Sequence, residues 1–279
     1  MSTIRTAGLM AFMFVLFALV GQALGGTGGM AIALVFALGM NVFSYWFSDS
    51  IVLKMHGAQE ISRADAPELY DLVDRLRRRA DLPMPRVCII PQDQPNAFAT
   101  GRNPENGVVA VTRGIMRALS REELEGVIAH ELAHIKNRDI LISSIAATMA
   151  AAITLLARFG FFFGGGRERG GFVGALLMMI LAPLAAMLIQ MAISRSREYV
   201  ADRDGARIAE NPMGLARALQ RLESAAQSQP MRSSSQATSH LFIVNPFSGG
   251  MRGLKSLFST HPSTEDRVAR LNEMARSGV

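Results

Sequence analysis

Cysteine is nearly absent from this chain, since Cys88 is the only one in 279 residues. A single cysteine excludes an internal disulfide, so the fold does not require an oxidising compartment, and a zinc site would need nitrogen or oxygen ligands. Charge is also missing from long stretches. None of the 43 residues between Arg5 and Asp49 is charged, and uncharged runs of 18 and 25 residues come after Asp139 and Arg169. This distribution excludes a wholly soluble globule, a disordered chain and a fibrous repeat.

The first uncharged run contains two apolar stretches, 6–24 and 30–47. Crossing ~30 Å of hydrocarbon takes about 20 apolar residues in a helix, so each stretch is close to the length of a membrane span. A glycine-rich run at 25–29 separates them and favours a tight helical hairpin. The aromatic run 45–47 is typical of the membrane–water interface. A signal peptide cleaved near Ala23 is the alternative interpretation.

Two more apolar stretches, 140–157 and 171–194, follow later in the chain. The first of them has only 18 residues and is rich in alanine, so a buried or interfacial helix is an alternative to a span. Arginine and lysine favour the cytoplasmic ends of spans. If both stretches span, the cytoplasmic side carries Arg5, Lys54, Lys136, Arg138, Arg195 and Arg197, and the opposite loop carries Arg158, Arg167 and Arg169. Those last three arginines count against full spanning.

The net charge is +6 and the pI is about 10.2, which raises the question of nucleic acid binding. The basic residues are not interleaved with aromatic ones, and several of them flank apolar stretches. We therefore expect the lipid bilayer, and no nucleic acid, to be a partner of this chain.

The charged parts of the sequence predict a small mixed domain. Residues 65–80 have the pattern of an amphipathic helix, opened by Asp65 and Glu68 at capping-box spacing. The stretch 227–253 is rich in serine and glycine and predicts a loop. The predicted strands are 86–90, 97–100 and 108–112, the last two as a hairpin around the turn-rich 101–107.

The motif that carries chemistry is His130-Glu131-Leu132-Ala133-His134, an HExxH sequence on a helix predicted to open at a capping box of Ser120 and Glu123. Residues four apart lie one turn apart on the same helix face, so both imidazoles can reach one tetrahedral zinc. Glu131 then projects beside the ion, where it can take a proton from a water that the zinc activates. A helix that carries two histidines by chance is the alternative.

A catalytic zinc takes three protein ligands and leaves one position open. Glu198 is the best candidate for the third ligand, in a predicted helix that continues from the last apolar stretch. Asp202 lies one turn further on the same face, where it can accept the second ring N–H of a ligating histidine. Taken alone, both acids would be interpreted as ordinary surface charge paired with nearby arginines.

Four motifs occur together in this order: Asn96-Ala97-Phe98-Ala99-Thr100-Gly101, the HExxH helix followed by Asn137-Arg138-Asp139, the segment 196–203, and Thr260-His261-Pro262. Together they resemble the HtpX family of bacterial membrane zinc metalloproteases, which is related to the CAAX prenyl endopeptidases. The resemblance extends over nearly the whole chain. It implies one Zn²⁺ per chain held by His130, His134 and Glu198, and proteolysis of membrane proteins as the activity.

The expected fold is mainly α with a small β-sheet, as an integral membrane protein with two to four transmembrane helices and a cytoplasmic zincin-type protease domain. If His130, His134 and Glu198 share one ion, the stretches 140–157 and 171–194 must leave and return on one side, so either both span or neither does. At ~1.5 Å per helical residue the zinc would lie within about 10 Å of the membrane surface. The predicted parts are a transmembrane hairpin at 1–48, protease segments at 49–139 and 195–279, and an apolar helical pair at 140–194.

Two further groups are candidates for binding the substrate and for stabilising the transition state. The segment Asn96, Ala97, Phe98 and Ala99 is a candidate edge strand for binding an extended peptide substrate, with a plain structural hairpin as the alternative. His261 precedes a helix that Ser263 can cap, where the helix dipole disfavours imidazolium. A neutral His261 could donate to the oxyanion of the tetrahedral intermediate, and a histidine that bonds local backbone is equally compatible with the sequence.

The leading functional hypothesis is a zinc endopeptidase of the bacterial inner membrane that cleaves cytoplasmic segments of misfolded or damaged membrane proteins, as in stress-response quality control. Its partners would be membrane-protein or unfolded-protein substrates. A non-enzymatic membrane adaptor stabilised by a closed metal site is one alternative. A processing protease with one dedicated substrate is another.

Overall fold

The structure is a computed structural model that describes residues 2–139, 195–228, 243 and 262–278. The chain divides into two compact units, Met1–Ser48 with Leu141–Ile193, and Asp49–Ile140 with Ser194–Val279. The apolar stretches 140–157 and 171–194, His261 and most of the predicted loop 227–253 lie outside the described residues.

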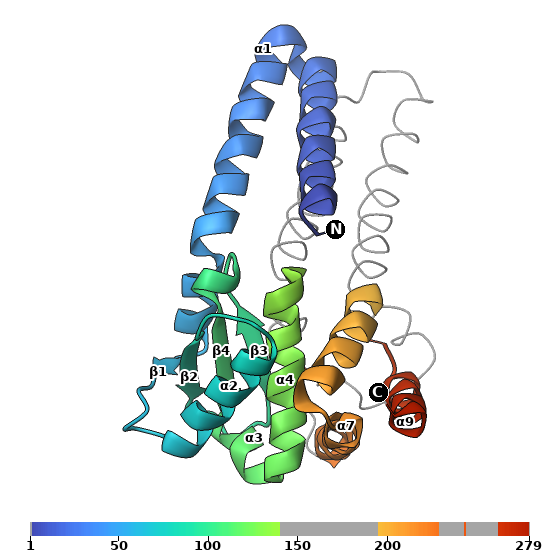
Figure 1. Cartoon of the computed structure of the whole chain (residues 1–279). Coiled ribbons are helices and arrows are strands. Elements are labelled where there is room, and N and C mark those ends of the chain that lie inside the picture. The colour runs from blue at the N-terminus through green and yellow to red at the C-terminus, as the bar shows by residue number, and fades with distance from the viewer. Residues whose placement is uncertain (1, 140–194, 229–242, 244–261, 279) are drawn as a thin grey trace. The chain divides into compact units, whose positions relative to one another are not determined.

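The N-terminal helix α1 (Ser2–Met55) reverses direction at Gly26, whose φ of +59° suits glycine (Figure 1). A Cβ on Gly21 would lie 2.6 Å from the carbonyl oxygen of Gly29 and 2.7 Å from Cβ of Ala33, so the two halves of the helix pack closely. Within the described ranges, no helix combines the length and the hydropathy that crossing a membrane requires. The number of transmembrane helices therefore stays a prediction.

The second unit contains a four-stranded sheet with the order β1-β2-β4-β3, and α4 lies between this sheet and α7 (Figure 1). The strands β3 and β4 pair antiparallel and β2 pairs parallel with β4, so the predicted hairpin and the predicted strand before it are confirmed. β3 lies at one edge of the sheet. The strands are β1 (Gln59–Glu60), β2 (Arg86–Ile90), β3 (Ala97–Thr100) and β4 (Val108–Thr112), with a 3₁₀ turn at Pro104–Asn106 in the hairpin.

Alternate residues of the strands pack on opposite faces of the sheet, as the pleat requires. One face, with Val109 and Val111 at its centre, packs against the helices in the main hydrophobic core. The other face, which includes Phe98, packs against Leu53 from the last turns of α1. The remaining helices are α2 (Pro67–Arg79), α3 (Arg113–Ala118), α4 (Arg121–Asn137), residues 195–209, α7 (Pro212–Ser228) and α9 (Thr264–Ser277). The predicted mainly helical fold with a small sheet is therefore confirmed.

The cap predicted for α4 is correct, and the cap predicted for α2 is wrong. Ser120 and Glu123 form the predicted capping box of α4, with both reciprocal hydrogen bonds present. Asp65 does not cap α2, because its carboxylate accepts hydrogen bonds from the backbone N–H and the hydroxyl of Ser62 instead. Pro67 opens that helix, where its fixed φ fits and its missing N–H removes one unpaired donor.

Cys88 offers a test of the sheet. It lies in β2 with 2% of its surface exposed, and burial raises the pKa of its thiol to about 11. Because the thiolate is the reactive form, we expect Cys88 to react with maleimide at pH 8 orders of magnitude more slowly in the native protein than in denaturant. Mass spectrometry of the labelled protein measures this ratio. Rapid labelling of the native protein would contradict the buried position of β2.

Candidate metal centre

The HExxH helix α4 presents its motif to the interior. His130 is 1% exposed and Glu131 is 4% exposed, so the motif is part of the core. The helical residues 195–209 approach α4 closely at Gly205, where a Cβ would lie 2.8 Å from Cα of His130. Only glycine fits that distance, because any larger residue would push the two backbones apart. Glu198 lies two turns before Gly205 and so faces the same neighbour.

The structure brings the three predicted ligands together. The Nε2 atoms of His130 and His134 lie 3.1 Å apart. Oε2 of Glu198 lies 3.6 Å from Nε2 of His130, and Oε1 of Glu198 lies 3.5 Å from Nε2 of His134. A tetrahedral zinc with bonds of about 2.0–2.1 Å has ligand atoms about 3.3–3.4 Å apart. The three side chains come close to this spacing, with one ligand atom from each lying within 4.8 Å of the others, and among the described residues they form a group that could hold a metal ion.

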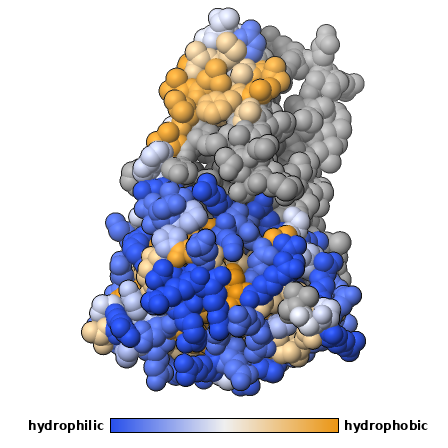
Figure 2. Space-filling view, viewed as in Figure 1, coloured by the Kyte–Doolittle hydropathy of each residue, from blue (hydrophilic) through white to orange (hydrophobic). Residues whose placement is uncertain are grey.

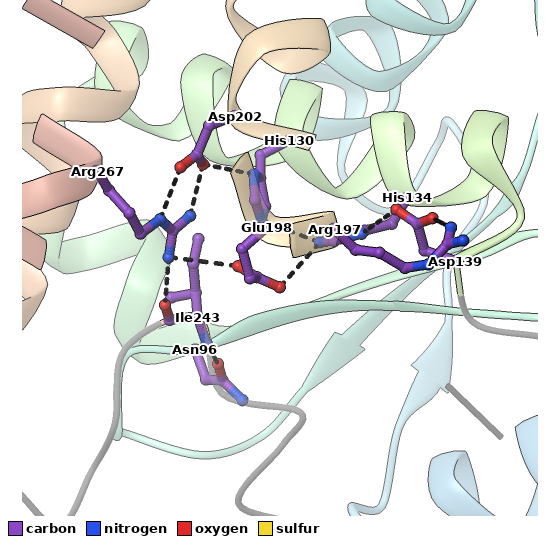
Figure 3. Close-up of polar contacts among 9 residues, drawn as sticks. All are labelled: Asn96, His130, His134, Asp139, Arg197, Glu198, Asp202, Ile243 and Arg267. Carbon is purple, nitrogen blue, oxygen red and sulfur yellow. Dashed lines mark hydrogen bonds and ion pairs between the residues drawn. The ribbon is translucent and has the colours of Figure 1, made fainter. Parts of the chain in front are cut away.

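The outer nitrogen of each histidine contacts a buried carboxylate (Figure 3). Nδ1 of His130 lies 3.0 Å from Asp202, which is the contact that its position one turn after Glu198 predicts. Nδ1 of His134 lies 2.9 Å from Asp139. A carboxylate that accepts the Nδ1 hydrogen fixes the ring and leaves the Nε2 lone pair for a metal. Both rings are thus oriented to present Nε2 to a shared ion.

Arg267 from α9 is a site residue that the sequence analysis did not identify. Its guanidinium makes two hydrogen bonds to Asp202, at 2.6 and 2.8 Å, and lies 3.5 Å from Glu198. It is 1% exposed. The sequence did contain a sign of this role. Arg267 lies one turn before Leu271, which is fully buried, so the arginine is on the apolar stripe of an amphipathic helix. A charge on such a stripe indicates a buried partner of opposite sign.

Asp139 and Arg197 were also missed. Asp139 is 3% exposed and contacts both His134 and Arg197. Regular helical spacing does not predict its contact with His134, because residues five apart do not share a helix face. Arg138 makes the contact possible by taking the left-handed conformation, with φ of 56° and ψ of 35°, at the end of α4.

Burial and charge act in opposite directions on the ionisable groups of the site. Burial raises the pKa of Glu131 above its usual value, against the opposing effect of the two histidines. Burial raises the pKa of Asp202 too, but Arg267 and His130 outweigh it and lower that pKa to about 2. Burial lowers the pKa of His134, while its hydrogen bond to Asp139 and the charge of Glu198 raise it to about 9. A proton and a metal ion therefore compete for His134.

The predicted substrate segment, Asn96 to Ala99, includes the edge strand β3. Some of its backbone groups point toward β4, and others point toward the open edge of the sheet. Asn96 bonds inward, since its carbonyl accepts from the N–H of Thr112 on β4. By the antiparallel alternation, the backbone groups of Ala97 and Ala99 point toward the open edge, and those of Phe98 point toward β4. The N–H of Ala99 hydrogen-bonds to the carboxylate of Glu131, so the edge strand directly adjoins the HExxH helix.

The C-terminal motif is only partly described. Ser263 caps α9 as predicted, with its hydroxyl accepting from the N–H of Asp266. His261 lies outside the described residues, so its role stays a prediction. Ile243 is the one described residue of the segment 229–261. Its N–H donates to the side chain of Asn96 and its carbonyl accepts from Arg267.

Comparison with known proteins adds independent findings. The sequence pattern of peptidase family M48 matches residues 63–275. The chain is 71% identical over 275 residues to the protease HtpX homolog of Salinibacter ruber, covering 99% of each chain. It is 56% identical over 282 residues to the protease HtpX homolog of Syntrophobacter fumaroxidans, covering 98% of this chain and 99% of that one.

A solved structure shares the fold. The crystal structure of S. mikatae Ste24p matches with a TM-score of 0.59 at 19% identity, covering 95% of this chain and 63% of Ste24p. The HExxH helix, the acid brought to it from 195–209 and these similarities agree. The chain therefore belongs to peptidase family M48, within its HtpX group, and is a metalloprotease.

Proposed function

We propose that this metalloprotease is a zinc endopeptidase that cleaves cytoplasmic segments of misfolded or damaged membrane proteins at the bacterial inner membrane. The observation that carries the proposal is the triangle formed by two imidazole nitrogens and one carboxylate. The two Nε2 atoms lie 3.1 Å apart, and Oε2 and Oε1 of Glu198 lie 3.6 Å and 3.5 Å from Nε2 of His130 and of His134, respectively. Glu131 and an edge strand adjoin this triangle.

Zinc suits the donor set of His130, His134 and Glu198, because two imidazoles and one carboxylate with an open fourth position are a common catalytic zinc arrangement. One such ion per chain would polarise the scissile carbonyl and activate water at neutral pH. The chain itself supplies the orientation of the ligands, through the carboxylates at the two Nδ1 atoms.

Glu131 is the proposed general base and acid. It follows His130 directly, so its carboxylate lies beside the ligand triangle and not within it. Burial raises its pKa, which makes the carboxylate a better proton acceptor than an exposed one. It would take a proton from the attacking water and deliver it to the leaving amine. A neutral His261 donating to the oxyanion is part of the same proposal.

The edge strand β3 is the proposed support for the substrate. An extended peptide added to an open edge forms main-chain hydrogen bonds, which bind many sequences without selecting side chains. The outward-facing backbone groups of Ala97 and the carbonyl of Ala99 would supply these bonds, because the N–H of Ala99 already donates to Glu131. Asn96 would fix the start of the strand. A site that binds main chain suits unfolded substrates of varied sequence.

Two observations support the proposed membrane location: a long stretch without charged residues, and apolar side chains that are exposed. None of the 43 residues between Arg5 and Asp49 is charged. Large apolar side chains are exposed on α1, and Figure 2 shows orange, apolar residues gathered on its visible surface. Exposed apolar surface of this extent marks contact with lipid or another protein. The exposed residues are Val15, Leu19, Ile32, Val35, Phe36, Leu38, Val42, Trp46 and Met55.

The catalytic proposal is tested by Glu131→Gln, which keeps the size of the side chain and removes the proton acceptor. We expect cleavage of casein by the detergent-solubilised protein to fall by about 10²-fold or more, since a positioned general base contributes ~10²–10⁴-fold. Zinc content, measured by mass spectrometry on the same sample, should stay at one per chain. A variant that cleaves as fast as the unmodified protein would exclude this role for Glu131.

The role of Asp202 is tested by Asp202→Asn. We expect zinc affinity to fall by roughly 10 to 100-fold, because the carboxylate that orients His130 loses its charge. Competition with a chromogenic chelator measures the affinity. The matched control is Asp71→Asn, which removes an exposed carboxylate paired with Arg63 far from the ligands in sequence and should leave the affinity unchanged. Equal affinities of the two variants would contradict the proposed contact.

The substrate class is tested by comparing the membrane proteome of cells that produce the unmodified protein with that of cells that produce Glu131→Gln. Quality control predicts that many membrane proteins accumulate with the inactive variant, most of all under heat or misfolding stress. A dedicated processing protease predicts one uncleaved precursor in both conditions. Membership of a peptidase family already argues against the adaptor hypothesis.

A further inference from the structure

The two proposed histidine ligands are supported in the same way, each by a carboxylate that is held by an arginine. In the first series of contacts, Nδ1 of His130 contacts Asp202, and Asp202 pairs with Arg267. The second series runs from His134 to Asp139 and then to Arg197 (Figure 3). Its acid and its arginine lie at two important places in the chain: Asp139 follows Arg138, the residue that caps the end of α4, and Arg197 directly precedes Glu198.

The backbone at the end of α4 is shaped for this contact. Arg138 has a φ of 56°, in the left-handed region that a residue with a side chain seldom adopts, and its N–H caps the carbonyls of His134 and Ile135. This turn brings Asp139 back toward His134. Glycine is the usual residue at such a position, so the sequence accepts a less favourable conformation where the turn delivers a carboxylate to a ligand.

Both oxygens of Asp139 are used. Oδ2 lies 2.9 Å from Nδ1 of His134, and Oδ1 accepts a hydrogen bond from the guanidinium of Arg197. The side chains of Asp139 and Arg197 are 4% and 14% exposed, so little water reaches the pair. A buried carboxylate requires such a partner, because it cannot be solvated there. Without Arg197, Asp139 would keep only its contact with His134 among those described.

We propose that Arg197 is a positioning residue for the metal centre, an inference that rests on the proposed zinc site. Through Asp139 it holds the ring of His134 in the orientation that binds metal. Because Arg197 precedes Glu198, the same ion pair also holds the helical turn that carries the third ligand. One contact, between residues 58 apart in sequence, thus sets the separation of ligands from α4 and from 195–209.

The first test is zinc affinity of the full-length, detergent-solubilised Arg197→Gln variant, measured by competition with a chromogenic chelator. We expect affinity to fall by roughly 10 to 100-fold, as for other groups that orient a ligand. Arg203→Gln is the matched control, since Arg203 lies on the same helix, is half exposed and pairs with its neighbour Asp204. It should bind zinc like the unmodified protein.

Two further variants separate positioning from general stability. Arg197→Lys keeps the positive charge, so its affinity should lie closer to that of the unmodified protein than to that of Arg197→Gln. Asp139→Asn should weaken zinc binding by itself, and adding Arg197→Gln to it should cost little more, because both act through one contact. The visible spectrum of the Co²⁺-substituted protein should change with Arg197→Gln and Asp139→Asn, since it reports ligand geometry, and not with Arg203→Gln.

The outcomes distinguish this inference from the proposed function. If the unmodified protein binds no zinc, or if Glu198→Gln binds it equally well, the proposed metal site is wrong. If the unmodified protein binds zinc and Arg197→Gln retains the same affinity and Co²⁺ spectrum, the site stands and the positioning role is wrong. Should Arg197→Gln not fold, Asp139→Asn decides: zinc affinity equal to that of the unmodified protein overturns the inference.

Discussion

The described structure depends on burying four carboxylates in one region: Glu131, Asp139, Glu198 and Asp202 are each at most 5% exposed. Carboxylates at such depth repel one another and are stable only beside cations. The arginines at 197 and 267 supply two positive charges. Burial also raises the pKa of Glu131, which favours its neutral form. The remaining carboxylate, Glu198, faces the two histidines, where a metal ion would balance its charge.

Local patterns in the sequence predicted much of this arrangement. The HExxH spacing, the capping box at Ser120 and the strands depend on neighbours a few residues apart, where helix and strand geometry is fixed. Helical spacing made Glu198 and Asp202 candidates, but the resemblance to the HtpX family was needed to favour Glu198 as a ligand over ordinary surface charge. The cap at Asp65 failed because Ser62, three residues earlier, competes for the same carboxylate.

The remainder depends on contacts that no local period encodes. Arg267 reaches Asp202 across 65 residues of sequence, and Asp139 reaches His134 only through a left-handed turn. The close approach at Gly205, which lets Glu198 meet the histidines, depends on two helix backbones that the sequence separates by more than 70 residues. Such contacts follow from tertiary packing, so a single sequence gives little indication of them.

The edge strand has a second neighbour besides the HExxH helix. Phe98 points to the opposite face from Ala97 and Ala99, and its ring lies 5.5 Å from that of His56, in the turn that ends α1. Leu53, in the last turn of α1, belongs to the same cluster. The strand proposed to receive a peptide is thus braced from behind by the junction where the N-terminal helix meets the sheet. A change at Leu53 or His56 would therefore act on the edge strand through Phe98, from the face of the sheet opposite to Ala97 and Ala99.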